Sequence, residues 1–190
     1  MKHTDNTLAS EPRVYLRPLA DSDAEAIFDY WREPRVSCFA EMKMNSLDDA
    51  LTYIGAEENG EKDPHHLAVC LKDGDALIGD VSAAFDNSDT CSVVWCLNPR
   101  YEGKGLAYEA AREYISYLFE KAGARRIYAY VEEDNVRSRR LCERLGMRLE
   151  GCMKEFISFV KTPDGTPHYE NTCLYALLKK EWEAASPTPR

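Results

Sequence analysis

Apolar residues recur along the chain with two periods, and the changes between them divide it into expected strands and helices. Alternation over 13–18 predicts a short strand. Helical spacing over 21–32, with Asp21 as the expected N-cap, predicts the first helix. A second helix is expected over 46–57, because Ser46 is followed three residues later by an acidic side chain, a near-match to the capping box.

The second half of the chain predicts an antiparallel meander followed by two helix–strand units. A glycine-bearing loop opens a long helix that Gly123 ends, and a shorter helix over 136–145 is ended by Gly146. This order of strands and helices is typical of a mixed α/β layer fold. The remaining strands are expected at 66–71, 76–85, 91–97, 127–131, 155–160 and 169–178.

The composition fits one globular domain. The chain has 190 residues, of which 44% are hydrophobic and 30% are charged. The domain is expected over 13–183, between a loose polar tail at 1–12 and a C-terminal tail at 184–190. No apolar run reaches the length of about 18 residues that a membrane span needs. The N-terminal stretch also lacks the apolar segment of a secretory signal.

Charge and cysteine usage narrow the classes of partner. The formal net charge of -9 argues against wholesale nucleic-acid binding and is compatible with a cationic acceptor. Seven cysteines without a C-x-x-C pair are expected to be mostly buried free thiols in the reducing cytoplasm. The four histidines have no zinc-ligand spacing, so no metal site is expected.

Two glycines stand between the strand expected at 91–97 and the long helix. Gly103 and Gly105 allow the backbone to bend, and the first helical turn offers unpaired N–H groups at the positive end of the helix dipole. Together with Lys104 they predict a phosphate or pyrophosphate site, although a tight turn without a ligand would need the same glycines. Neither the Walker pattern nor the dinucleotide fingerprint is present.

A basic segment surrounds the shorter helix. Between Lys121 and Arg148, eight Lys or Arg side chains stand against four Asp or Glu. Asn135 is well placed to cap the helix, and Ser138 lies three residues further on. The segment is therefore either an ordinary capped and solvated helix or the rim of an anion site.

The glycine loop resembles the acetyl-CoA pyrophosphate loop of the GNAT superfamily of N-acetyltransferases. The family pattern is Q/R-x-x-G-x-G/A, and the matching stretch lies within Pro99–Ala111. Gly105 and Ala107 match the last two defined positions, while Glu102 stands where Gln or Arg is usual.

Three further stretches carry the resemblance. Asn135-x-x-Ser138, with Leu145–Met147 after it, is similar to the second conserved block of the superfamily. Trp31–Pro34 and the ending at 174–178 are similar to the branch that holds the ribosomal-protein N-terminal acetyltransferases, of the RimJ/RimL type. The resemblance covers the whole expected domain.

The resemblance implies a fold and an activity. The fold class is α/β (α+β), with a mixed, mostly antiparallel central sheet of about six to seven strands and helices on both faces. The activity is direct transfer of the acetyl group of acetyl-CoA to a primary amine on a protein N-terminus, a peptide or a small molecule. The expected protein is a cytoplasmic enzyme, monomer or homodimer, with no metal, nucleic-acid or membrane partner.

The resemblance also assigns roles to single residues. Trp95 and Leu97 would offer main-chain groups to the pantetheine arm, and Asn135 with Ser138 would reach its sulfur end. Ser138 is the expected catalytic donor to the leaving thiolate, because Cys142 stands where many members have Tyr. Backbone N–H groups of the loop would hold the pyrophosphate: Glu102, Gly103, Lys104, Gly105, Leu106 and Ala107.

A general base is harder to assign. Glu155, just past the second block, is expected to be the base by similarity of position, although a surface carboxylate at a strand start would look the same. Asn171 departs from the branch, in which Asp often follows the Tyr equivalent to Tyr169, so a different acceptor is an open alternative.

Three other functions stay open. The transferred group could be another acyl group such as succinyl, since the acyl pocket is built from dispersed side chains. The absent Tyr and the replacement at Glu102 would also suit a CoA-binding module without catalysis. A nucleotide-binding protein would need a different use of the glycine loop.

Overall fold

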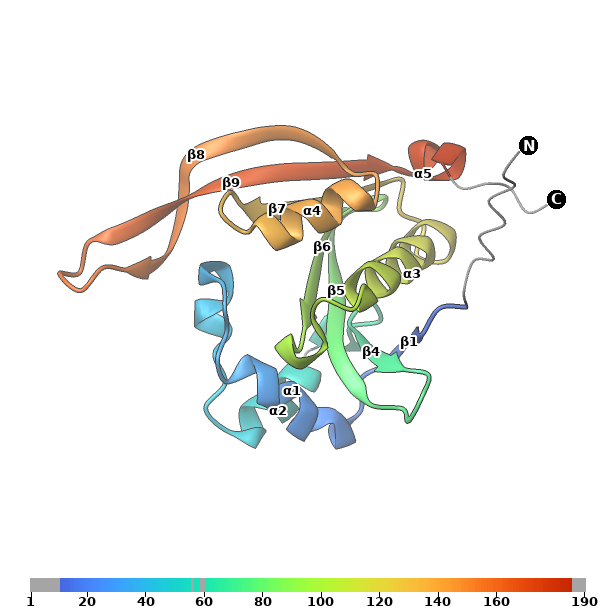
Figure 1. The fold of residues 1–190 in the computed structure, drawn as a ribbon, viewed down its shortest axis with the longest axis horizontal. Helices are drawn as coiled ribbons and strands as arrows, with labels where there is room; N and C mark the ends of the chain where they lie inside the picture. Colours follow the sequence, from blue (N-terminus) through green and yellow to red (C-terminus); the bar gives the residue numbers. More distant parts are fainter. Residues whose placement is uncertain (1–10, 56, 59–60, 186–190) are drawn as a thin grey trace, which may run out of the picture.

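The structure, a computed structural model, describes residues 11–55, 57–58 and 61–185 (Figure 1). Most of the expected tail at 1–12, and residues 186–190 of the other, lie outside them. The main sheet has seven strands in the order β1-β4-β5-β6-β7-β9-β8. In that order the strands are β1 (Val14–Pro18), β4 (Leu67–Leu71), β5 (Leu77–Asn87), β6 (Thr90–Leu97), β7 (Arg126–Glu132), β9 (Pro167–Leu178) and β8 (Arg148–Lys161).

Helices and short 3-10 turns connect the strands. A small separate sheet pairs β2 (Glu57–Glu58) with β3 (Glu61–Lys62) and was not predicted from the pattern. The helices are α1 (Ala24–Trp31), α2 (Leu47–Ile54), α3 (Leu106–Glu120), α4 (Val136–Arg144) and α5 (Lys179–Ala185). The 3-10 turns are η1 (Asp21–Asp23), η2 (Ser37–Met42) and η3 (Pro99–Tyr101).

Neighbouring strands of the main sheet are antiparallel except β6 and β7, which are parallel. Parallel neighbours need a crossover connection, and α3 supplies it between these two strands. The predicted mixed, mostly antiparallel sheet is therefore confirmed, as is the predicted order of the main-sheet strands and their helices. The C-terminal helix α5 was not part of that order.

Helices cover both faces of the sheet, as the alternation within β4 demonstrates. Leu67 and Val69 belong to the core cluster shared with α3 and α4, whereas Ala68 and Cys70 belong to the cluster shared with α1 and α2. Successive side chains of a strand point to opposite faces, so the sheet lies between two helical layers. No helix among the described residues is long and apolar enough to cross a membrane.

The first helix begins later than the pattern predicted. The turn η1 precedes α1, and the carboxylate of Asp23, not that of Asp21, accepts the N–H of Ala20 at 2.9 Å. Asp23 also accepts both terminal guanidinium nitrogens of Arg17 on β1, at 2.7 and 2.8 Å. The ion pair with Arg17 thus holds the Asp23 carboxylate at the start of η1, and helical spacing alone does not reveal it.

The predicted capping box of the second helix is confirmed. Ser46 Oγ accepts the N–H of Asp49 at 3.2 Å, and the Asp49 carboxylate accepts the N–H of Ser46 at 3.1 Å. Asp can therefore fill the position that Glu or Gln usually holds. The helix ends at Ile54, before Gly55, rather than near residue 57, because 57–58 form a strand.

Strand β8 is much longer than the strand expected at 155–160. It begins at Arg148, and register shifts against β9 interrupt it in three places. Glu155 lies in one of them and has a positive φ of 49°. Because such bulges break the two-residue alternation, the pattern missed the first half of the strand. Together β8 and β9 form an arm that extends beyond the body of the molecule (Figure 1).

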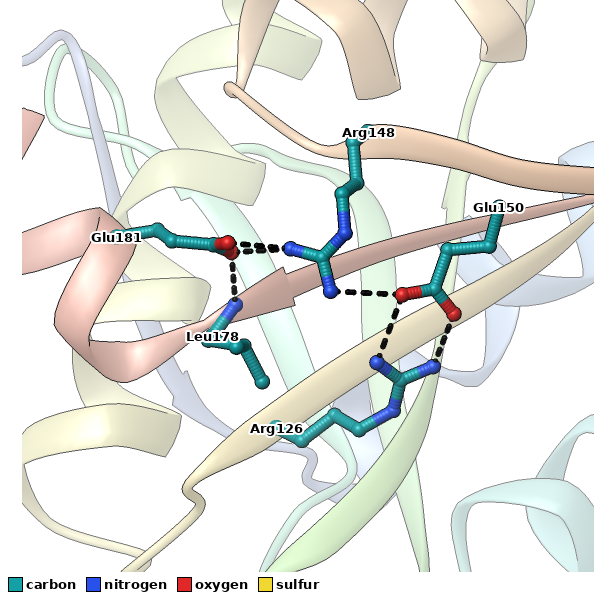
Figure 2. A network of polar contacts seen from close by, with 5 residues as sticks. All are labelled: Arg126, Arg148, Glu150, Leu178 and Glu181. Carbon is teal, nitrogen blue, oxygen red and sulfur yellow. Dashed lines mark hydrogen bonds and ion pairs between the residues drawn. The ribbon is translucent and has the colours of Figure 1, made fainter.

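An ion-pair network fastens the arm to the body (Figure 2). Glu150 accepts hydrogen bonds from Arg126 Nη1 on β7 at 3.0 Å and from Arg148 Nη2 at 2.7 Å. Arg148 also donates to Glu181 of α5, which accepts the N–H of Leu178 at 2.9 Å. The guanidinium groups, that of Arg126 first, lower the pKa of Glu150 to about 2. The network thus joins three strands and α5.

A buried carboxylate anchors α1 and α2 to the other face. Asp80 of β5 accepts the hydroxyls of Tyr30 and Tyr53, each at 2.6 Å, and lies 3.0 Å from His66 Nε2. Burial, followed by the nearby carboxylate, raises the pKa of both tyrosines. Three partners offset the cost of burying the charge, so Asp80 ties both helices to the sheet.

Gly79 of β5 packs against the end of β6, where a methyl group has no room. A Cβ atom there would collide with the Cys96 carbonyl oxygen and lie 2.9 Å from Leu97 Cα. Gly79→Ala is expected to lower the free energy of unfolding by about 1–3 kcal/mol, measured by urea denaturation. Gly151→Ala, with no neighbouring atom within 4 Å, is the matched control and should cost under about 0.5 kcal/mol. Equal losses of stability in the two variants would contradict the close approach of Gly79 to the end of β6.

Candidate active site

The parallel strands β6 and β7 diverge almost as soon as they meet. They pair at three positions, from Thr90 with Arg126 to Ser92 with Tyr128. Beyond these, β6 stays paired with β5 and β7 with β9, so a wedge opens between them. The wedge holds a cleft of about 220 Å³. It is lined by residues of η2, β6, β7 and the start of α4: Cys38, Phe39, Val93, Val94, Trp95, Ala129, Tyr130, Val131, Glu132, Asn135 and Ser138.

The glycine loop ends at the N-terminus of α3. Gly103 and Gly105 have φ angles of +74° and +80°, a conformation that other residues rarely adopt. Gly105 is the N-cap residue of α3 and has no side chain to cap the first-turn N–H groups. These groups and the helix dipole favour an anion at this end, and the binding of a phosphate or pyrophosphate there stays a prediction.

Glu102, the unusual residue of the loop, lies between two arginines. Its Oε1 accepts a hydrogen bond from Arg35 Nη1 at 2.8 Å, and its Oε2 accepts one from Arg137 Nη1 at 2.6 Å. Two guanidinium groups on one carboxylate leave a net positive charge beside the loop. The basic segment of the sequence included Arg137, but Arg35 is distant along the chain and no local pattern linked it to the loop.

The start of α4 brings three predicted residues together at the cleft. Asn135 Oδ1 accepts the N–H of Ser138 at 3.1 Å, so the predicted helix cap is confirmed. Ser138 Oγ also accepts a hydrogen bond from Trp95 Nε1 on β6, at 3.2 Å. The contact links the two sides of the wedge and holds the serine hydroxyl in the cleft.

Two other predicted residues lie outside the cleft lining. Leu97, at the end of β6, is half-buried and packs against the core shared with α3. Glu155 is exposed in the β8 bulge, where its N–H donates to Asn171 Oδ1 at 2.9 Å. The role of Glu155 as a base stays a prediction.

Sequence reasoning missed the carboxylate that does line the cleft. Glu132, the last residue of β7, is only 6% exposed, and its Oε1 accepts the N–H of Cys38 on η2 at 2.7 Å. Burial, followed by the negative charges of Glu170 and Asp134, raises its pKa. The available signal was an acidic run, 132–134, directly after a strand, but such runs are usually solvated.

The position at which many family members have Tyr is filled by a core thiol. Cys142 of α4 is fully buried, and burial raises its pKa to about 12. It belongs to the core cluster shared with α3 rather than to the cleft lining. Ser138 is therefore the hydroxyl group that α4 presents to the cleft.

The arrangement suits an extended ligand with an anionic group at one end. The positive loop at α3 would receive the anion, and the cleft between β6 and β7 would receive an arm that ends near Ser138. Among the described residues, no three His, Cys, Asp or Glu side chains gather to hold a metal ion.

Known proteins share this sequence pattern. The profile of the Acetyltransferase (GNAT) domain family matches residues 13–148. The N-acetyltransferase YnaD of Bacillus subtilis, itself uncharacterised, is 31% identical over 90% of this chain and 96% of its own length. The spermidine N(1)-acetyltransferase of Escherichia coli K12 is 29% identical over 49% of this chain and 47% of its own length.

Solved structures share the fold. An acetyltransferase of the GNAT family from Bacillus anthracis matches with a TM-score of 0.75 and 27% identity, over 88% of this chain and 96% of its own. The two folds thus agree over most of the length of both chains. The chain belongs to the GNAT family of N-acetyltransferases, whose members use acetyl-CoA as co-substrate.

Proposed function

We propose that this protein transfers the acetyl group of acetyl-CoA directly to a primary amine. The observation that carries the proposal is the wedge between β6 and β7 together with the uncapped N-terminus of α3, whose loop residue Glu102 accepts a hydrogen bond from Arg137 of α4. A pyrophosphate at that N-terminus and a pantetheine arm in the wedge match these two features in charge and shape. A cytoplasmic location, which the free cysteines support, belongs to the same proposal.

The chain offers acetyl-CoA two kinds of contact. Arg35 and Arg137 add positive charge beside the loop, and the main chain of Trp95 and Leu97 would follow the pantetheine arm. Bound acetyl-CoA would supply the acetyl group as a reactive thioester. Backbone N–H groups at the start of α3 would hold the pyrophosphate: Glu102, Gly103, Lys104, Gly105, Leu106 and Ala107.

Ser138 is suited to assist departure of the thiol. Its Oγ already accepts a hydrogen bond from Trp95, which leaves its own O–H free to donate. Asn135, through the backbone of Ser138, fixes the first turn from which the hydroxyl projects. A donor held in this way would stabilise the negative charge that develops on the leaving sulfur.

The acceptor is proposed to be a cationic amine in water. A chain of net charge -9 attracts such a group, and the cleft carries a carboxylate at its β7 side. A protein N-terminus and a small amine both fit this description. The similarity of Trp31–Pro34 and 174–178 to the RimJ/RimL-type branch supports a protein acceptor, and a partial relative that acetylates spermidine supports a small one.

A CoA-binding module without catalysis is the second candidate. Cys142, buried where many members have a catalytic Tyr, is the observation that favours it. Release of free CoA in the presence of an amine would exclude this candidate. Tight binding of CoA without turnover across a broad amine panel would favour it.

The loop can be tested through ligand binding. Gly105→Arg places a long side chain in a positive-φ position at the start of α3, where even its Cβ would lie 3.5 Å from Arg13 Nη2. Acetyl-CoA at about a hundredfold excess over its dissociation constant should stabilise the wild type by about 2.7 kcal/mol. The rise in Tm should vanish in a folded Gly105→Arg variant.

The control for this variant is Gly165→Arg. Gly165, in the β8–β9 turn, has a similar φ of +87° and no neighbouring atom within 4 Å of its Cβ position. It carries the same backbone strain away from the loop, so the shift with acetyl-CoA should be retained. A wild type that acetyl-CoA does not stabilise would remove the proposed activity.

The hydroxyl of Ser138 can be tested through turnover. Ser138→Ala should lower kcat by about 10²-fold, because a positioned donor contributes about 10²–10⁴-fold. The Tm shift with acetyl-CoA should change little, since the Asn135 cap bonds the backbone rather than the hydroxyl. Ser116→Ala, on the exposed side of α3, should leave kcat unchanged. An unaltered kcat in Ser138→Ala would exclude the donor role.

A further inference from the structure

Glu132 is the one carboxylate among the described residues that line the cleft. It ends β7 on the side of the wedge opposite Trp95, three residues before the Asn135 cap. A side chain at this point faces the same space as Ser138, so the cleft holds a proton acceptor on one wall and a hydroxyl donor near it.

Among the described residues, the carboxylate of Glu132 has hydrogen-bond contacts with Cys38 alone. Its Oε1 accepts the N–H of Cys38 at 2.7 Å, and Cys38 itself lines the cleft from η2. An ionised carboxylate has about four lone-pair sites on its two oxygens, so the contacts with the backbone N–H and the thiol of Cys38 leave acceptor sites for an ammonium group. The contacts with Cys38 therefore orient the carboxylate and leave it able to bind a further donor.

No Lys or Arg of the described chain forms an ion pair with Glu132. The charged and titratable groups that face it are the thiol of Cys38 from η2, Glu170 from β9, and Asp134 after β7. Each of these would be neutral or negative, so a cation that enters the cleft meets an uncompensated carboxylate. Burial and these negative neighbours raise the pKa of Glu132, which brings its proton affinity nearer to that of an amine.

Glu133, the next residue along the chain, has a contrasting environment. Glu133 accepts both contacts of Lys154 at 2.8 Å and the amide of Asn171 at 2.7 Å, and the ammonium group first lowers its pKa to about 2. A carboxylate that is already neutralised by a cation accepts protons poorly. Two adjacent glutamates thus have opposite environments, a pattern that separates proton acceptors from structural carboxylates.

We propose that Glu132 is the catalytic residue that binds the acceptor ammonium group and removes its proton. This inference rests on the proposed function and moves the base from Glu155 in β8 to the end of β7. It also assigns the acceptor class, a protonated primary amine in the cleft that Phe39 and Tyr130 line.

The proton balance of the step is complete. The acceptor enters as R–NH₃⁺ and gives one proton to the Glu132 carboxylate, which leaves a neutral amine with a free electron pair. That pair forms the new bond from nitrogen to the acetyl carbon, and the carbon–sulfur bond breaks. A second proton leaves the nitrogen and ends on the thiol, while the carboxyl of Glu132 returns its proton to water.

The experiment compares Glu132→Gln with Glu133→Gln and Glu155→Gln. Gln is nearly isosteric and can still accept the N–H of Cys38, so the fold and the Tm shift with acetyl-CoA should be retained. The probes are spermidine and a tripeptide with a free N-terminus, and release of CoA is followed over pH. Glu132→Gln should lower kcat by at least about 10²-fold, and the Glu133→Gln control should stay within about twofold of wild type. Glu155→Gln tests the competing assignment of the base to β8.

The pH dependence of kcat/KM separates a catalytic role of Glu132 from a structural one, because loss of a structural contact would not change that dependence. In the wild type, the acidic limb of kcat/KM should lie above the ordinary pKa of Glu, about 4.3, because the pKa of Glu132 is raised. This limb should disappear in Glu132→Gln. Glu132→Asp should keep it with a lower kcat, and this variant carries the test if Glu132→Gln does not fold.

Three outcomes would overturn the inference in distinguishable ways. Wild-type kcat in Glu132→Gln would exclude Glu132 alone and leave the proposed function intact. Loss of turnover in Glu155→Gln instead would return the base to β8. A wild type that binds acetyl-CoA but acetylates neither probe nor a broad panel of primary amines would overturn the proposed function and the role of Glu132 with it.

Discussion

The divergence of β6 from β7 is the constraint on which the rest of the molecule depends. Each strand is hydrogen-bonded along its length to its outer neighbour, β6 to β5 at eight positions and β7 to β9 at seven. Between them they share only three paired positions. Because sheets twist and each half is tied to its own partners, the two halves separate and open a cleft in the middle of the sheet.

The packing around the cleft keeps the two halves at a fixed separation. Helix α3 packs against residues of both halves in one core cluster, and Trp95 joins β6 to the start of α4 through Ser138. At the margins, Asp80 holds α1 and α2 against the β5 side, while the Glu150 network holds β8 and α5 at the β7 side (Figure 2). A rigid wedge can present a ligand's reactive end at one defined place.

Two glutamates illustrate how the surroundings give the same residue type different roles. Glu102 lies between two guanidinium groups at the edge of the loop, so its charge is neutralised and it fixes Arg35 and Arg137 in position. Glu132 is nearly enclosed, has no cationic partner in the described chain and hydrogen-bonds there to Cys38. Position along the chain does not distinguish them, since Glu132 is the last residue of a strand and Glu102 follows the end of one.

The sequence by itself determined those features of this protein that depend on residues close together along the chain. The periods of apolar residues, the glycines at 103 and 105, and the Asn135 cap depend on neighbours along the chain, so the order of the predicted elements, the anion loop and the start of α4 were predictable. Only the tertiary structure decided the rest. The bulges of β8, the pairing of Arg35 with Glu102 and the burial of Glu132 under Cys38 all arise from contacts between distant segments, which no local pattern records.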